Sequence, residues 1–193
     1  MDDHAPPLRP AEEFTGTARA TLTEVGAALA PLLPPHELLL TGGSSVPGAL
    51  TKGDVDLHLT VAPSDFDGTV ATLRTLYPVV HPEIWQATLA TFTVPARLPT
   101  GLAVTPAGSE HDRRFRRTWR LLGADPGLLA AYNAMKVAGA GGYETRKSAF
   151  FEWLLTSAET VRPVDSAGGD HLAGLAASAR ANADDSVTAE EMP

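Results

Sequence analysis

The strongest constraint on the fold comes from residues 54–61, where polar and apolar side chains alternate strictly. Such alternation is typical of a β-strand with one buried face. The apolar residues are expected to face the core, and the polar residues are expected to share the opposite face. The first set is Val55, Leu57 and Leu59, and the second is Asp54, Asp56 and His58.

The remaining periodicity predicts an α/β (α+β) chain with a mixed sheet, flanking helices and a helical C-terminal half. Amphipathic helices are expected at residues 11–33, 64–76, 110–122, 126–137 and 143–157. A short strand is expected around residues 38–40, with two or three more inside 79–86, 88–94 and 102–105. Ser109 is a predicted helix cap, and Asp125-Pro126 is a standard helix start.

Length and composition predict one folded domain followed by a tail. At 193 residues and 44% hydrophobic content, the chain can bury a core, expected within residues 1–162. Residues 163–193 contain few large apolar side chains, and six acids against one arginine give them five of the eight net negative charges. We therefore expect a mobile, acidic tail.

Composition also excludes several classes of function and location. The chain has no cysteine, which excludes disulfides and thiolate metal sites. Its first residues lack the pattern of a signal peptide, and no apolar run approaches the ~20 residues that cross a bilayer. These features predict a cytoplasmic protein without a membrane partner.

Two carboxylates could carry chemistry because they lie two residues apart on the predicted strand. Asp54 and Asp56 would point the same way, roughly 7 Å apart at the backbone. Such a pair can hold a hard divalent cation, Mg²⁺ or Mn²⁺, and leave coordination positions open for phosphate oxygens. The alternative is a solvated strand face, which is the commoner use of acids at this spacing.

A glycine-rich turn, Gly42-Gly43-Ser44-Ser45, precedes the strand. Glycine lets backbone N–H groups approach an anion closely, and the serine hydroxyls add polar groups. No Walker lysine follows the glycines, and no Gly-x-Ser-x-Gly elbow surrounds the serines. The turn is therefore a candidate phosphate-binding loop outside the P-loop and serine-hydrolase classes.

A glycine-serine turn shortly before an Asp-x-Asp strand is typical of the DNA polymerase β-like nucleotidyltransferases. Within that superfamily the chain resembles the GrpB family. The run from Gly42 to Gly48, then Lys52 and Asp56, is similar to the family's Gly-Ser-Thr-Ser-Val-Pro-Gly, Leu-Ala-Ala-Lys and Asp-bearing strand. Similar positions continue over residues 36–156, at Gly108-Ser109-Glu110, Phe115-Arg116, Asp125-Pro126, Tyr132, Lys136, Tyr143, Lys147 and Phe150.

The resemblance implies a nucleotidyltransferase-like fold and a nucleotide site, while the family's reaction stays open. It implies that the loop holds triphosphate through Gly42, Gly43, Ser44 and Ser45, and that Asp54 and Asp56 hold the metal. Lys52, Lys136 and Lys147 are further candidate phosphate ligands, the alternative for each being an ordinary surface lysine. The arginines of residues 110–122 likewise either meet phosphates or form a solvated face.

The sequence also departs from the pattern. Asp54 stands where the family has an apolar residue, which restores the two-acid motif of the superfamily. Gly101-Leu102-Ala103 replaces the family's His-x-His, so two imidazoles are missing. Active superfamily members also present a third carboxylate from a later strand, often as the base. Residues 88–94 contain no acid, which leaves Glu83 as the candidate.

The sequence thus predicts a metal-dependent nucleotidyltransferase that moves a nucleotidyl group from an NTP to an unknown small acceptor. Asp54 and Asp56 would be its catalytic and metal-binding residues. A net charge of −8 and a one-domain build argue against an extended nucleic-acid tract. Two alternatives remain: a catalytically degenerate protein that binds a nucleotide or phosphorylated metabolite, and an interaction module with an acidic tail. The oligomeric state is open.

Overall fold

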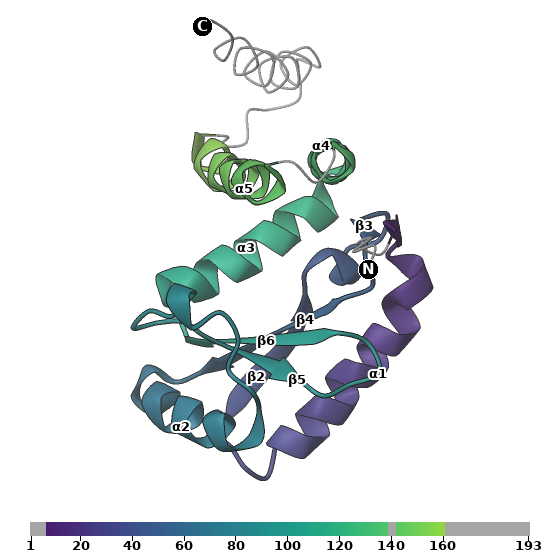
Figure 1. The fold of residues 1–193 in the computed structure, drawn as a ribbon. Coiled ribbons are helices and arrows are strands. Elements are labelled where there is room, and N and C mark those ends of the chain that lie inside the picture. The colour runs from purple at the N-terminus through teal and green to yellow at the C-terminus, as the bar shows by residue number, and fades with distance from the viewer. Residues whose placement is uncertain (1–6, 139–141, 161–193) are drawn as a thin grey trace, which may run out of the picture. The chain divides into compact units, whose positions relative to one another are not determined.

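The structure is a computed structural model that describes residues 7–138 and 142–160. The chain divides into two compact units, Met1–Leu155 and Thr156–Pro193. The sheet and the helices that pack on it belong to the first unit, which is a mixed α+β domain (Figure 1). The predicted acidic tail at 163–193 lies outside the described residues and stays a prediction, as does the boundary at residue 162.

The helices are α1 (Glu12–Leu29), α2 (Phe66–Leu76), α3 (Glu110–Ala124), α4 (Pro126–Val137) and α5 (Tyr143–Thr160), with short 3₁₀ turns η1 (Gly43–Ser45), η2 (Pro63–Asp65) and η3 (Pro82–Ile84). The strands are β1 (Arg9–Pro10), β2 (His36–Thr41), β3 (Leu50–Thr51), β4 (Val55–Val61), β5 (Ala90–Val94) and β6 (Thr100–Pro106).

The main sheet has the strand order β2-β4-β6-β5 and is mixed. Strand β4 is antiparallel to β2 and parallel to β6, while β5 is antiparallel to β6. Because β4 and β6 are parallel, the chain crosses between them through α2 and β5. Strands β1 and β3 form a separate antiparallel pair. Strand β4 is therefore a central strand of the sheet, with Asp56 in it and Asp54 immediately before it.

Helices α1 and α2 cover one face of the sheet, and α3 crosses the opposite face (Figure 1). On the first face, Leu57 and Leu59 of β4 are buried with Leu29 of α1, Leu73 of α2 and Phe92 of β5. Burying a side chain of this size contributes about 1.5–3 kcal/mol. This apolar layer fixes the position of β4.

A second core joins the helical half together. The ring of Trp119 on α3 lies 6.0 Å from that of Tyr132 on α4 and 5.8 Å from that of Phe151 on α5, both edge-on. Leu122 and Leu154 are buried in the same cluster. Aromatic packing therefore holds α4 beside α3, and α4 in turn reaches the loop that contains η1.

Several predicted helix boundaries are confirmed, and their caps explain them. The Ser109 hydroxyl accepts the Asp112 N–H, and the Asp125 carboxylate accepts the N–H groups of Gly127 and Leu128. Helix α4 has the predicted bounds. Helix α1 stops at Leu29, four residues before the predicted end, because the chain continues in tight turns.

Of the two or three strands expected within residues 79–86, 88–94 and 102–105, two form, β5 and β6, and the segment 79–86 contains none. Val79 and Gln86 form only isolated bridges there, and η3 occupies the middle of the segment. His81 has φ 48°, a left-handed conformation, and Pro82 cannot donate to a sheet ladder. The segment therefore turns where a strand would continue.

The expectation that only one face of β4 is buried is wrong. Asp54 lies one residue before the strand. His58 is 0% exposed and Thr60 5% exposed, because α3 covers this face. The Phe115 ring stacks on the His58 ring at 4.8 Å, and the Thr105 hydroxyl lies 2.7 Å from His58 Nε2. His58 is a structural residue of the α3 interface.

Arg116 secures the same interface with ion pairs. Its guanidinium donates to the Asp112 carboxylate at 2.6 Å and to the Glu37 carboxylate at 2.7 Å. A third bond reaches the Thr60 hydroxyl at 3.1 Å. The α3 arginines were expected either to meet phosphates or to form a solvated face. Arg116 does neither, because it joins α3 to β2 and β4.

Acid should weaken this interface through His58. Burial lowers the pKa of His58 from 6.5 to about 4, against the raising effect of Asp112. At His58 the unfolded chain therefore binds more protons than the folded chain between these values, and the contribution of this group to stability falls as pH drops from about 6.5 to 4. The expected loss is up to about 3 kcal/mol. Urea unfolding across this range should show a smaller loss for His58→Gln, while His81→Gln, at an exposed histidine, should behave like the parent.

Candidate functional site

The site begins with a close fit between Gly42 and Asp56. A Cβ atom at position 42 would lie 1.8 Å from Asp56 Oδ2, so the carboxylate occupies the space of a side chain. Gly42 has φ 73° and ψ −176°, a conformation open essentially to glycine alone. The first glycine of the turn is therefore needed both for its backbone and for its missing side chain.

Hydrogen bonds join the loop to the other acid. The Ser44 hydroxyl donates to the Asp54 carbonyl at 2.5 Å, and the Thr51 hydroxyl donates to the Asp54 carboxylate at 3.0 Å. The Ser45 hydroxyl donates to the Gly42 carbonyl at 2.7 Å. Asp54 itself is exposed. The serines predicted to bind phosphate thus shape the loop and hold it against the residues before β4.

Helix α4 supports the loop from the other side. The Asn133 amide accepts the Leu50 N–H at 2.8 Å and donates to the Gly48 carbonyl at 2.8 Å. Lys136 Nζ donates to the Leu50 carbonyl at 2.7 Å. The same Nζ would lie 3.0 Å from a Cβ at Gly43, so the second glycine gives the ammonium access to the turn.

The charges of the site act on one another. Burial raises the pKa of Asp56 from 3.8 to about 6; Asp54 raises it further, whereas Lys147 and Lys136 lower it. Burial also lowers the pKa of Lys136, against the raising effects of Asp54 and Asp56; Lys147 and Lys52 lower it too. The two acids and three lysines predicted from sequence therefore share one electrostatic neighbourhood.

The neighbouring strand places no third carboxylate beside Asp56. Gly101 of β6 pairs with Asp56, and a Cβ there would lie 3.9 Å from Asp56 Oδ1. Glu83 is exposed on η3, where its carboxylate contacts His81. Within residues 7–138 and 142–160, no three His, Cys, Asp or Glu side chains form a group that could hold a metal. Glu83 is therefore not a strand-borne third acid.

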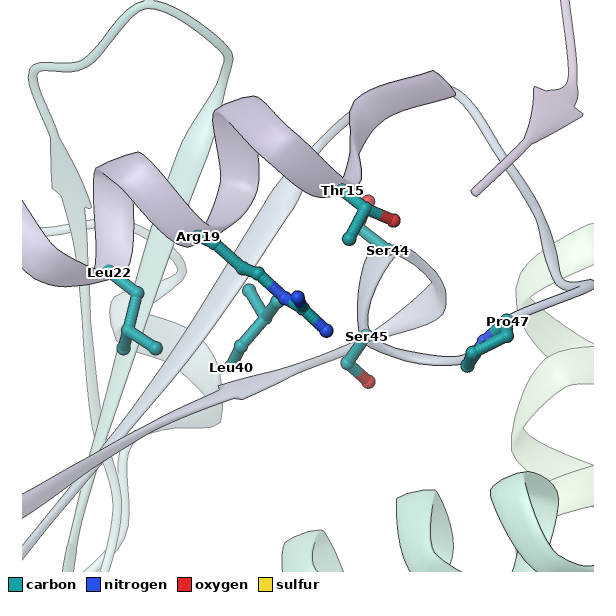
Figure 2. A pocket seen from close by; sticks show the side chains of 7 residues that line it. All are labelled: Thr15, Arg19, Leu22, Leu40, Ser44, Ser45 and Pro47. Atoms are coloured by element: carbon teal, nitrogen blue, oxygen red, sulfur yellow. The ribbon is translucent and has the colours of Figure 1, made fainter. Parts of the chain in front are cut away.

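A cavity of about 240 Å³ borders the loop between α1 and β2 (Figure 2). Its lining includes Ser44 and Ser45 but neither predicted metal ligand. Leu40, also in the lining, pairs with Leu57, whose side chain points to the face opposite that of Asp56. The cavity and the Asp56 carboxylate therefore lie on opposite faces of the sheet, with the loop at the edge between them.

Two residues of the site were not predicted from sequence. Thr51 contacts both Ser44 and Asp54, and Asn133 makes a two-way bond to the loop. Asn133 stands three residues before Lys136, a spacing that places both on one side of a helix. That spacing was the available signal, whereas nothing marks Thr51 among the other threonines.

Known structures share the fold of this chain. GrpB from Enterococcus faecalis superposes with a TM-score of 0.61 at 15% identity, over 79% of this chain and 96% of that one. The chain has the GrpB fold. A chain of the GLD-2/RNP-8 complex superposes with a TM-score of 0.53 at 15% identity, over 86% of this chain and 75% of its own length. The predicted nucleotidyltransferase-like fold and the predicted likeness to GrpB are confirmed.

A curated relative extends the likeness to sequence. A UPF0157 protein of Vibrio cholerae is 27% identical over 155 residues, which span 77% of this chain and 81% of that protein. The chain matches no protein-family profile. None of the described helices of this GrpB-like chain is long and apolar enough to cross a membrane.

The Gly42–Asp56 fit makes Gly42 sensitive to any side chain. Gly42→Ala is expected to lower the free energy of unfolding by at least about 2 kcal/mol, since it adds backbone strain to a steric overlap. Chemical denaturation measures this. Gly68→Ala is the matched control: Gly68 lies in α2 with nothing within 4 Å of its Cβ position, so the change should stabilise by about 0.5–1 kcal/mol. Equal effects of the two substitutions would contradict the fit.

The raised pKa of Asp56 has its own pH signature in the metal-free protein. Between pH 3.8 and about 6 the folded chain binds more protons at this group than the unfolded chain, so its contribution to stability falls as pH rises through that window. Asp56→Asn should therefore gain up to about 3 kcal/mol over the parent at pH 8 and nothing below pH 4. Asp67→Asn, at an exposed acid of α2, should show no such pH-dependent gain in thermal melts.

Proposed function

We propose that the chain is a Mg²⁺- or Mn²⁺-dependent nucleotidyltransferase that moves a nucleotidyl group from an NTP to a small acceptor. The observation that carries the proposal is the juxtaposition of Asp56 with Asp54, the η1 loop and Lys136 at the head of β4. The fold shared with GrpB and the GLD-2/RNP-8 chain supports it.

The donors present suit a hard divalent cation. Asp54 and Asp56 supply carboxylate oxygen, and Mg²⁺ is commonly bound by one or two carboxylates together with substrate phosphates and water. When bound there, such an ion neutralises phosphate charge and aligns the phosphoryl group for displacement. Burial first and then repulsion by Asp54 raise the pKa of Asp56, and a cation between the two acids would relieve that repulsion.

The lysines would hold the triphosphate. Lys136 is fixed by the Leu50 carbonyl and lies over the Tyr132 ring at 4.7 Å, so its ammonium is already positioned against Gly43. Lys52 and Lys147 are close enough to lower the pKa of Lys136. Together with a bound divalent cation, these lysines would offset the negative charge of a triphosphate.

A second candidate is binding of a nucleotide or phosphorylated metabolite without turnover. Gly101 is the residue that favours it, because the strand beside Asp56 lacks the side chain that could supply a base there. An acceptor whose attacking oxygen is already ionised, such as a phosphate, would need no base. Turnover with such an acceptor therefore separates the two candidates.

Calorimetry with each of the four common NTPs, in Mg²⁺, in Mn²⁺ and in EDTA, tests the site. Asp56→Asn is expected to weaken metal-dependent binding by tenfold or more, since a charged ligand contributes about 1.5–3 kcal/mol. Lys52→Gln should weaken binding as well. Asp67→Asn should bind as the parent does. Equal affinity of the parent and Asp56→Asn in all conditions would overturn the metal site.

Pyrophosphate release by the parent protein then tests transfer. Release that requires Mg²⁺ or Mn²⁺ and an added acceptor, and that Asp56→Asn abolishes, supports the transferase. Binding without release for every NTP and for phosphate, hydroxyl and carboxylate acceptors supports the second candidate.

A further inference from the structure

The cavity between α1 and β2 is not used by the proposed nucleotide site. It has about 240 Å³ and is lined by Thr15, Arg19, Leu22, Leu40, Ser44, Ser45 and Pro47. It lies on the opposite face of the sheet from the Asp56 carboxylate, as the pairing of Leu40 with Leu57 requires. A ligand here would be held by groups other than the two acids and the three lysines.

One side of this cavity is cationic. Arg19 extends from α1 over the cavity toward Ser45 (Figure 2). Among the described residues its guanidinium makes no hydrogen bond or ion pair, and the Thr23 hydroxyl bonds only to its backbone carbonyl. None of the seven lining residues is acidic. Arg19 is an exposed residue, and its guanidinium, with five N–H donors, borders a space whose lining holds no counter-charge.

The hydroxyls of the lining are already engaged as donors. The Thr15 hydroxyl donates to the Ala11 carbonyl, and the Ser44 and Ser45 hydroxyls donate to the carbonyls of Asp54 and Gly42. The guanidinium is therefore the principal free donor, and it would anchor one anionic group. Carboxylate and phosphate both match its planar fork.

The other side of the cavity is apolar. Leu22 of α1, Leu40 of β2 and Pro47 after the loop supply it. A volume below the about 300–1,000 Å³ of pockets for drug-sized ligands restricts the occupant to a small molecule. The lining as a whole suits a single anionic head with a short hydrocarbon portion.

We propose that this cavity binds a small amphiphilic anion, a carboxylate or phosphate monoester with a short alkyl portion, with Arg19 as its anchor. The ligand would contact the η1 loop at Ser44 and Ser45, whereas the same loop contacts Asp56 through Gly42. The proposal stands independently of nucleotidyl transfer.

Calorimetry in EDTA with butyl phosphate, methyl phosphate and butyrate tests the cavity. Butyl phosphate is expected to bind more tightly than methyl phosphate, by about fourfold for each methylene that the cavity buries. Arg19→Gln should weaken butyl phosphate binding tenfold or more, and Leu22→Ser should reduce the preference for butyl over methyl. Comparison of butyrate with butyl phosphate shows which head group is preferred.

Two control variants test whether butyl phosphate binds in this cavity and not elsewhere. Arg120→Gln, at an exposed arginine of α3, and Lys52→Gln, in the proposed nucleotide site, should both bind butyl phosphate as the parent does. Arg19→Gln should leave metal-dependent NTP binding unchanged, so the two sites fail separately. The proposal is overturned if Arg19→Gln binds butyl phosphate as tightly as the parent, if Lys52→Gln is the variant that loses it, or if no probe binds at millimolar concentration.

Discussion

The Asp56 carboxylate occupies the space that any side chain at position 42 would fill, and the site is organised around this contact. Because Gly42 has no side chain, the loop can close over the head of β4 and cover much of the Asp56 carboxylate. Burial raises the pKa of Asp56, and the same closure brings Gly43 close enough for Lys136 to reach the turn. One missing methyl group therefore sets both the shape of the loop and the charge state of the acid.

Local sequence patterns were sufficient for much of the fold. Asp125-Pro126 marked the start of α4, and the apolar residues of 54–61 marked β4 and its buried face. The opposite face of β4 was misjudged, since alternation reveals only that one side is apolar. His58 and Thr60 are polar yet buried, because α3 supplies carboxylate and aromatic partners and β6 supplies the Thr105 hydroxyl, all from residues far along the chain. No pattern within the strand could indicate that cover.

Some residues of the candidate site could likewise be predicted from sequence, and others could not. The loop and Asp56 are close in sequence, so a sequence motif was sufficient to predict that they belong to one site. Lys136 was predicted from its resemblance to a family position. Thr51 accepts the Gly53 N–H and donates to the Asp54 carboxylate, and Asn133 bonds to backbone groups of Leu50 and Gly48, so both act by holding the loop in place. Residues of this kind are invisible to spacing arguments, because any polar residue that reaches the same backbone atoms would serve.

The dependence of the loop on α4 has a consequence for how the protein is made. Leu50 and Gly48 are bonded to Asn133 and Lys136, which lie 83 to 86 residues later in the chain. Contacts of such long sequence separation form late, because the intervening chain must be ordered first. The sheet can thus assemble on the ribosome from pairings of shorter sequence separation while the loop is still without its support. The candidate site is therefore complete only once the helical half has folded, so an incomplete chain carries both acids without the supported loop.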